Sequence, residues 1–191
     1  MTGRTHDLAA FTALNLVVIN QPITHIGLPT ALVALSANFI GGLAPDLDQP
    51  TADLWHRLPA GSLFGRLLSP LLGGHRFISH SIFGLVLFGV GLSYLLNLAS
   101  HVLLVNMSLV WWAFMIGYFS HLIMDTLTTE GVPWLFPAPI KLGFPPIKVL
   151  RIKTGGLIEK YLVFPVLLIL NGYLFYNLYP KYLELFHRLV K

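Results

Sequence analysis

The sequence has 191 residues, of which 55% are hydrophobic and only 10% are charged, whereas soluble domains usually carry about 25% charged residues. This composition argues against a water-soluble fold and favours a surface covered by lipid. The basic residues are scattered between apolar segments, so nucleic acid is not an expected partner. One domain over residues 1–191 is expected. Since the chain has no cysteine, any metal must be held by imidazole and carboxylate groups.

Apolar segments divide the chain into potential membrane spans. An early segment, residues 8–20, has only 13 residues, and we interpret it as a short or tilted span. Four later segments approach or reach the roughly 20 residues that a helix needs to cross a bilayer. They are residues 26–43, 77–98, 102–124 and 161–179. The predicted fold is therefore all-α, a polytopic membrane bundle of about five transmembrane helices with the lipid bilayer as its partner.

Two polar segments, residues 44–76 and 125–160, are rich in proline and glycine and are predicted to be loops. A short helix is expected around residues 52–58. If all five helices cross, both loops and the N-terminus lie on one face, and the connections near Gln21 and Ser100 lie on the other. The loop face carries nine of the 12 basic residues: Arg4, Arg57, Arg66, Arg76, Lys141, Lys148, Arg151, Lys153 and Lys160. The positive-inside bias therefore predicts a multi-pass protein of the cell (inner, or cytoplasmic) membrane whose loop face is cytoplasmic.

A histidine and an aspartate end the segment at residues 102–124. His121 and Asp125 are four residues apart, so on a helix their side chains share one face and can bind one ion or each other. Ionisable groups at membrane depth are commonly functional. The alternative is an interfacial histidine with an aspartate that caps the next element.

Two aspartates stand in a segment bounded by prolines. Pro45 and Pro50 disfavour a helix, and in an extended segment alternate residues point the same way. Asp46 and Asp48 are therefore expected to converge on one cation. The alternative is an ordinary acidic turn after a helix.

A third motif, at residues 73–81, opens the segment at residues 77–98. Arg76 and His80 are expected to share a helical face, with His75 close enough to reach the same centre. Guanidinium groups bind phosphate and carboxylate oxygens in pairs, so Arg76 is a candidate clamp for an oxyanion or phosphate. In the alternative interpretation Arg76 only extends its charge from the bilayer to water.

Hydropathy places seven candidate metal ligands at one membrane boundary: His6, Asp46, Asp48, His75, His80, His121 and Asp125. A catalytic zinc takes three protein ligands and a water, so seven ligands predict two or more divalent ions, with zinc or manganese favoured. Glu159 returns to this face before the last segment. It is a candidate catalytic base, with an extra ligand or a charge at a helix N-terminus as alternatives.

Together these motifs resemble the YdjM-type family of membrane-bound metal-dependent hydrolases. The family pattern combines an N-terminal His, a Pro-Asp-x-Asp-x-Pro loop, His-Arg-x-x-Thr-His-Ser, and Gly-Tyr-x-x-His-x3-Asp followed by Thr-x-x-Gly-Val-Pro. This sequence matches it at His6 and at residues 45–50, 75–81 and 117–133. It departs from it in having Gln49 where the family often has His, Phe77 in place of a small residue, and Ser79 in place of Thr.

The resemblance implies a hydrolase. The His and Asp set is also similar, by analogy, to that of helical zinc-dependent phospholipases C, which favours a phosphoester or related bond. A site at the headgroup boundary favours an amphiphilic or lipid substrate. Two alternatives remain: a transporter or channel for divalent metal, which would hold its ligands in mid-span, and a non-catalytic membrane protein whose polar cluster ties helices together.

Overall fold

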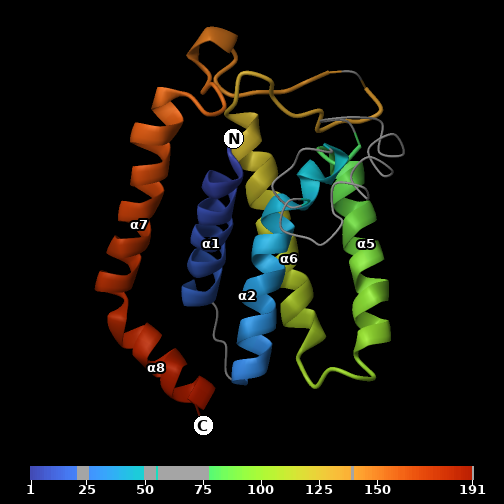
Figure 1. Ribbon diagram of the computed structural model, residues 1–191, viewed down its shortest axis with the longest axis vertical. Coiled ribbons are helices and arrows are strands. Elements are labelled where there is room, and N and C mark those ends of the chain that lie inside the picture. The colour runs from blue at the N-terminus through green and yellow to red at the C-terminus, as the bar shows by residue number, and fades with distance from the viewer. Residues whose placement is uncertain (21–25, 50–54, 56–77, 139, 191) are drawn as a thin grey trace.

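The computed structural model describes residues 1–20, 26–49, 55, 78–138 and 140–190, and these form an all-α bundle (Figure 1). The predicted fold class is confirmed. The α-helices are α1 (Gly3–Asn20), α2 (Leu28–Leu43), α5 (Ile82–Ala99), α6 (Met107–Thr126), α7 (Phe164–Asn177) and α8 (Tyr179–Val190). Three shorter helical segments are η1 (Ala44–Asp48), η2 (Lys148–Leu150) and the π-helix η3 (Glu159–Val163). The short helix expected around residues 52–58 lies outside the described residues, apart from Trp55.

Within the described part of the chain, three helical stretches are long and apolar enough to cross a membrane: Leu28–Asp48, Ile82–Ala99 and Met107–Thr126. The pair Glu159–Asn177 and Tyr179–His187, bent by 74°, makes a fourth if it counts as one span. The helix α1 has 18 residues but is not among these candidates, so its crossing of the membrane remains a prediction.

The outer helix α5 shows why lipid must cover this bundle. Only 11% of its span is buried inside the protein, and large apolar side chains such as Phe83, Val86 and Val90 are exposed. An apolar surface of this extent is covered by hydrocarbon in a membrane but would drive aggregation in water.

Small residues bring α2 and α6 into backbone contact at the centre of the bundle. A Cβ atom added to Gly41 would lie 2.1 Å from the carbonyl oxygen of Phe114, and one added to Gly117 would lie 2.1 Å from that of Asn38. The Asn38 amide nitrogen also donates to the carbonyl oxygen of Ala113 at 3.0 Å. In lipid, close packing and interhelical hydrogen bonds are what hold helices together. This contact fixes the end of α2 against α6.

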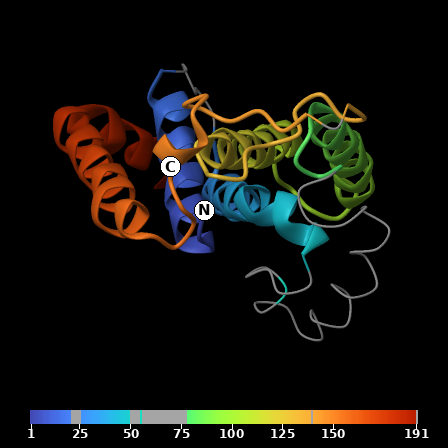
Figure 2. The same cartoon turned by 90° about the horizontal axis from the view of Figure 1, so that it is seen from above.

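The helices α1 and α7 are joined by polar side chains. Asn15 donates to Asn171 at 2.9 Å, and Asn171 donates to Thr12 at 2.7 Å. Figure 2 shows α7 and α8 on the opposite side of α1 from α5. Two boundaries differ from the sequence prediction: α1 begins at Gly3 instead of residue 8, and the C-terminal tail contains α8.

The segment between α6 and η3 crosses the end of the bundle where the N-terminus lies (Figure 1). Thr128 pairs with Ile152 and Val132 pairs with Leu142 as isolated β-bridges. The segment exposes apolar side chains, Val149 to 91%, beside exposed lysines at 141, 148 and 153. This mixture suits the level of lipid headgroups, where apolar groups reach hydrocarbon and lysines reach phosphates.

Candidate metal centre

The helix α6 supplies His121 and Asp125, both buried. The Nε2 atom of His121 lies 3.8 Å from Oδ2 of Asp125, so the predicted pairing on one helical face is confirmed. The Nδ1 atom of His121 lies 2.7 Å from the carbonyl oxygen of Gly42. Because a carbonyl only accepts, Nδ1 carries the proton, and the lone pair on Nε2 points into the centre.

His80 lies in a turn just before α5, which begins at Ile82 after the N-cap Ser81. The expectation that His80 belongs to a helical face is therefore wrong, because the Ser81 hydroxyl accepts from the Gly84 amide at 3.0 Å and starts the helix there. The hydroxyl of Tyr118 donates to the carbonyl oxygen of Ser79 and holds the turn against α6. His80 is thereby buried, with its Nε2 atom 3.3 Å from Nε2 of His121.

The expectation that Asp46 and Asp48 lie in an extended segment is also wrong, since Ala44–Asp48 forms the 3₁₀ helix η1. Proline is compatible with the first turn of a helix, and Pro45 occupies that position. With three residues per turn, side chains at i and i+2 point about 240° apart. Asp46 and Asp48 therefore diverge.

The two aspartates contact opposite ring nitrogens of His80. Oδ1 of Asp46 lies 3.5 Å from Nε2 of His80 and 3.6 Å from Nε2 of His121. Oδ2 of Asp48 lies 3.4 Å from Nδ1 of His80 and accepts a hydrogen bond from the Ser79 hydroxyl at 2.5 Å. Asp46 thus faces the centre, whereas Asp48 lies behind His80, in the place of a residue that orients a histidine ligand.

The two carboxylates also set the charge of His80. Burial by itself lowers the pKa of the imidazole, but the contacts with Asp46 and Asp48 outweigh it and raise that pKa to about 9. Cations are therefore stabilised at this position. A metal ion at Nε2 would have to replace the proton there, and the same carboxylates would stabilise its charge.

His6 reaches the same cluster from α1. Its ring stacks on that of His121 with a centroid distance of 3.7 Å and an angle of 12°, and its Nε2 atom lies 3.3 Å from Oδ1 of Asp125. The amino group of Met1 contacts the same carboxylate. Among the residues that the structure describes, the Nδ1 atom of His6 has no hydrogen-bond partner. A buried polar group without a partner is costly, and a metal ion would satisfy it.

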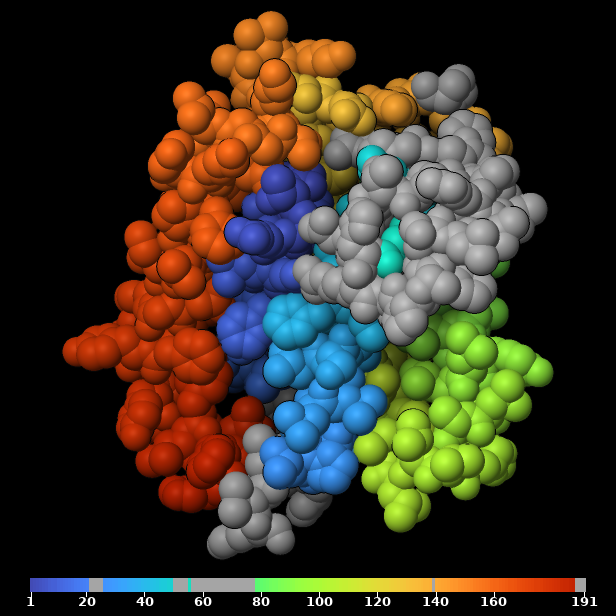
Figure 3. Space-filling view, viewed as in Figure 1, coloured from blue at the N-terminus to red at the C-terminus, as the bar shows by residue number. Residues whose placement is uncertain are grey.

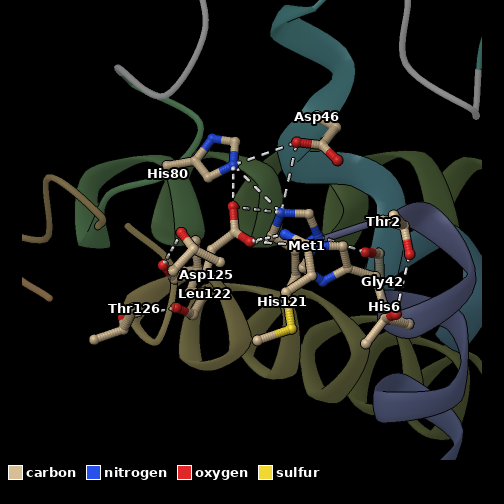
Figure 4. A network of polar contacts seen from close by, with 12 residues as sticks. Met1, Thr2, His6, Gly42, Asp46, His80, His121, Leu122, Asp125 and Thr126 are labelled. Atoms are coloured by element: carbon tan, nitrogen blue, oxygen red, sulfur yellow. Dashed lines mark hydrogen bonds and ion pairs between the residues drawn. The ribbon is translucent and has the colours of Figure 1, made fainter. Parts of the chain in front are cut away.

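The spacing of these atoms fits metal coordination. Two atoms bound to one tetrahedral zinc at about 2.0–2.2 Å lie about 3.3–3.6 Å apart. The atoms of Asp46, His80, His121 and Asp125 that face one another are separated by 3.3, 3.5, 3.6, 3.7 and 3.8 Å. Figure 4 shows these side chains pointing toward one another. Two overlapping groups of donor atoms can hold an ion: His6, Asp46 and His121, and His80, His121 and Asp125.

Glu159 is buried at the start of the π-helix η3. Its Oε1 atom accepts from the Thr2 amide at 2.7 Å, the Thr2 hydroxyl at 2.8 Å and the Thr5 hydroxyl at 2.7 Å. Its Oε2 atom accepts from the Gly155 amide at 2.7 Å. A carboxylate with this many donors favours a positioning role, tying the first turn of α1 to η3, over the predicted role of general base.

His75 and Arg76, predicted as ligand and anion clamp, lie outside the described residues. Sequence patterns missed two groups of the centre, the hydroxyl of Ser79 and the carbonyl of Gly42. Ser79 directly precedes His80, which is a weak signal, whereas a backbone carbonyl leaves none in the sequence.

These features define a polytopic membrane protein with a buried His and Asp cluster at one end of its helices. The chain belongs to the YdjM inner membrane protein family, whose model matches residues 1–182, as the motifs predicted. It is also similar to "Uncharacterized protein YvsG" from Bacillus subtilis (strain 168). The two are 29% identical over 180 residues, which cover 94% of this chain and 97% of the relative. No solved structure matches the chain.

Proposed function

We propose that this protein is a membrane-bound hydrolase that uses two or more divalent metal ions, zinc or manganese, to cleave a phosphoester or related bond in an amphiphilic or lipid substrate. The observation that carries the proposal is the convergence of His6, Asp46, His80, His121 and Asp125, which come from α1, η1, the turn before α5, and α6. Imidazole and carboxylate are the ligands that zinc and manganese accept in hydrolytic sites.

Each ligand has a defined task in this proposal. His121 offers Nε2 because Gly42 holds its other nitrogen, and His80 offers Nε2 because Asp48 and Ser79 face its Nδ1 atom. Asp46 is 20% exposed whereas the others are buried. The open coordination position that a substrate needs therefore lies on the Asp46 side.

The shared histidine bears on the proposed number of ions. The two groups of donor atoms have His121 in common, and its single available nitrogen can serve only one ion. Two ions would therefore draw on the other donors, and the carboxylates of Asp46 and Asp125, with two oxygens each, would help to hold them. Bound divalent ions would supply water activated at neutral pH and would neutralise charge developing on the leaving oxygen.

Two observations favour a hydrolase over the alternatives. The ligands lie at helix ends, not in mid-span, and the backbones of α2 and α6 touch at Gly41 and Gly117, which leaves no ion path between these two helices. A cluster that served only to join helices would not need a buried His6 whose Nδ1 atom lacks a hydrogen-bond partner among the described residues.

The site face is proposed to be cytoplasmic. Its described part carries Arg4, Lys141, Lys148, Arg151, Lys153 and Lys160. The connection between α5 and α6 at the other end of the bundle has no lysine or arginine. The positive-inside bias supports this orientation.

An assay of phosphoester hydrolysis tests the activity. The full chain is reconstituted in phospholipid nanodiscs, stripped of metal and reloaded with zinc or manganese, and release of phosphate or headgroup from anionic and neutral phospholipids is measured. We expect turnover that needs added metal, is abolished by Asp125→Asn, and survives His101→Ala, a change of an exposed histidine in the turn between α5 and α6. Turnover that persists without metal, or a metal-loaded protein that hydrolyses no phosphoester, would contradict the proposal.

A further inference from the structure

A cavity of about 610 Å³ opens beside the metal centre. Its walls come from the first turn of α1, from η1, and from η3 with the start of α7. Asp46, the partly exposed member of the His and Asp cluster, is one of the residues in its wall. Figure 3 shows the N-terminal end of α1 at the surface beside the start of α7. A molecule in this cavity would therefore lie next to the metal ligands.

Two cations line this cavity from different elements: Arg4 from α1 and Lys160 from η3. Both side chains are exposed, and neither has an ion-pair partner among the described residues. The two carboxylates of the cavity wall, Glu159 and Asp46, contact groups other than these two cations. Glu159 accepts hydrogen bonds from Thr2, Thr5 and Gly155, and Asp46 faces the two histidines. The positive charge of Arg4 and Lys160 is thus available to a ligand.

We propose that Arg4 and Lys160 form an anion subsite that binds a phosphate group of the substrate next to Asp46. A guanidinium donates two parallel hydrogen bonds to phosphate oxygens, and an ammonium adds a compact charge from the other wall. The inference that this phosphate belongs to a substrate rests on the proposed function, whereas the binding of an anion does not.

The rest of the cavity suits an amphiphile. Phe164 and Met1 supply apolar surface, and Gln49 supplies an amide at the same wall as Asp46. The segment between α6 and η3 at this end exposes Val149 and Leu150 beside lysines, which is typical of protein at headgroup level. The phosphate of a lipid headgroup is therefore favoured over a free phosphate, and the two sources can be separated by experiment.

Anion binding is measured on the full chain in non-ionic detergent, with EDTA present so that metal does not contribute. Calorimetric titrations use short-chain phosphatidic acid in one arm and inorganic phosphate in the other. We expect saturable binding of phosphatidic acid that Arg4→Gln and Lys160→Gln each weaken about 10- to 100-fold, since a charged hydrogen bond is worth about 1.5–3 kcal/mol and 1.4 kcal/mol is about tenfold. Lys160→Arg keeps most of the affinity.

The matched control is Lys153→Gln, which removes an exposed lysine at the same end of the protein that is not among the described residues of the cavity wall. It should bind like the parent. If the parent binds inorganic phosphate as tightly as phosphatidic acid and both variants lose both ligands, the result would support the subsite and assign it to soluble phosphate. No saturable binding by the parent, or equal binding by Arg4→Gln, Lys160→Gln and Lys153→Gln, would overturn the subsite.

The same variants separate this inference from the proposed function. If the parent retains no metal and hydrolyses nothing, but anion binding still depends on Arg4 and Lys160, the subsite stands and the hydrolase proposal fails. If the parent is a metal-dependent phosphoesterase whose KM is unchanged in Arg4→Gln and Lys160→Gln, the hydrolase stands and the subsite fails.

Discussion

The Nε2 atoms of His80 and His121 lie 3.3 Å apart, although 41 residues separate them in the sequence. The Nε2 atom of His121 carries a lone pair because its Nδ1 atom donates to Gly42. Two facing lone pairs would repel, so the pair of histidines is stable only with a proton or a cation between them. The surrounding carboxylates of Asp46 and Asp125 stabilise positive charge there, either as a proton on His80 or as a bound cation.

The first prediction concerns the residue behind His80. Asp48→Asn removes the charge that faces Nδ1 of His80 but leaves the donors of the centre in place, so metal affinity should fall about 10- to 100-fold with the number of bound ions unchanged. Competition with a chelator measures the affinity, and elemental analysis gives the number. Loss of a whole equivalent of metal would instead make Asp48 a ligand, as its position two residues from Asp46 predicts.

The second prediction tests the contact between α2 and α6. Gly117→Ala places a Cβ atom 2.1 Å from the carbonyl oxygen of Asn38, so the helices must separate, at a cost of about 1–3 kcal/mol or more. We expect a lower melting temperature and weaker metal retention, because Gly42 and His121 move apart. The control is Gly91→Ala in α5, where no described atom lies within 4 Å of the added Cβ. If both variants melt alike, the close packing does not position the site.

These interhelical contacts mark the limit of what the sequence could predict. Apolar runs predicted the helices, because hydrocarbon thickness fixes their length, and the spacing of His121 and Asp125 predicted one pair of candidate ligands. The prediction that Asp46 and Asp48 converge was wrong because Pro45, which disfavours the interior of a helix, is equally compatible with the first turn of one. That Asp48 faces Nδ1 of His80 depends on three-dimensional packing alone.

The extent of helix at the two ends of the chain was underestimated for a different reason. Residues 3–7 look unlike a membrane helix, yet they start α1. The hydroxyls of Thr2 and Thr5 donate to Glu159, and His6 enters the cluster. In α8, charged residues interrupt the apolar positions, so the helix does not show the continuous run that marks a span.

The third prediction distinguishes two roles for Glu159. Glu159→Gln keeps the shape but replaces one accepting oxygen with a donor, which leaves a buried amide or hydroxyl facing another donor. If Glu159 positions α1, stability should fall by about 1–3 kcal/mol while turnover per folded molecule changes little. Thermal unfolding and the hydrolysis assay measure the two effects separately. Unchanged stability with a loss of turnover of about 10²- to 10⁴-fold would indicate a general base.

The fourth prediction concerns orientation. Because the chain has no cysteine, single cysteines can report each face. In spheroplasts a membrane-impermeant maleimide should label Ser100→Cys, in the turn between α5 and α6, and should leave Lys153→Cys unlabelled until the membrane is permeabilised. Both positions are exposed, so access to the reagent depends on the side of the membrane. The reverse pattern would place the site on the outer face.

Elemental analysis of the purified protein beside two ligand variants tests the metal centre most directly. We predict two or more equivalents of zinc or manganese in the parent, and loss of metal in His121→Ala and Asp46→Ala when both variants remain folded by size-exclusion chromatography. His101→Ala should match the parent. Stoichiometric metal retained by both ligand variants, or none in a folded parent purified with zinc and manganese, would contradict the assignment of this cluster as a metal site.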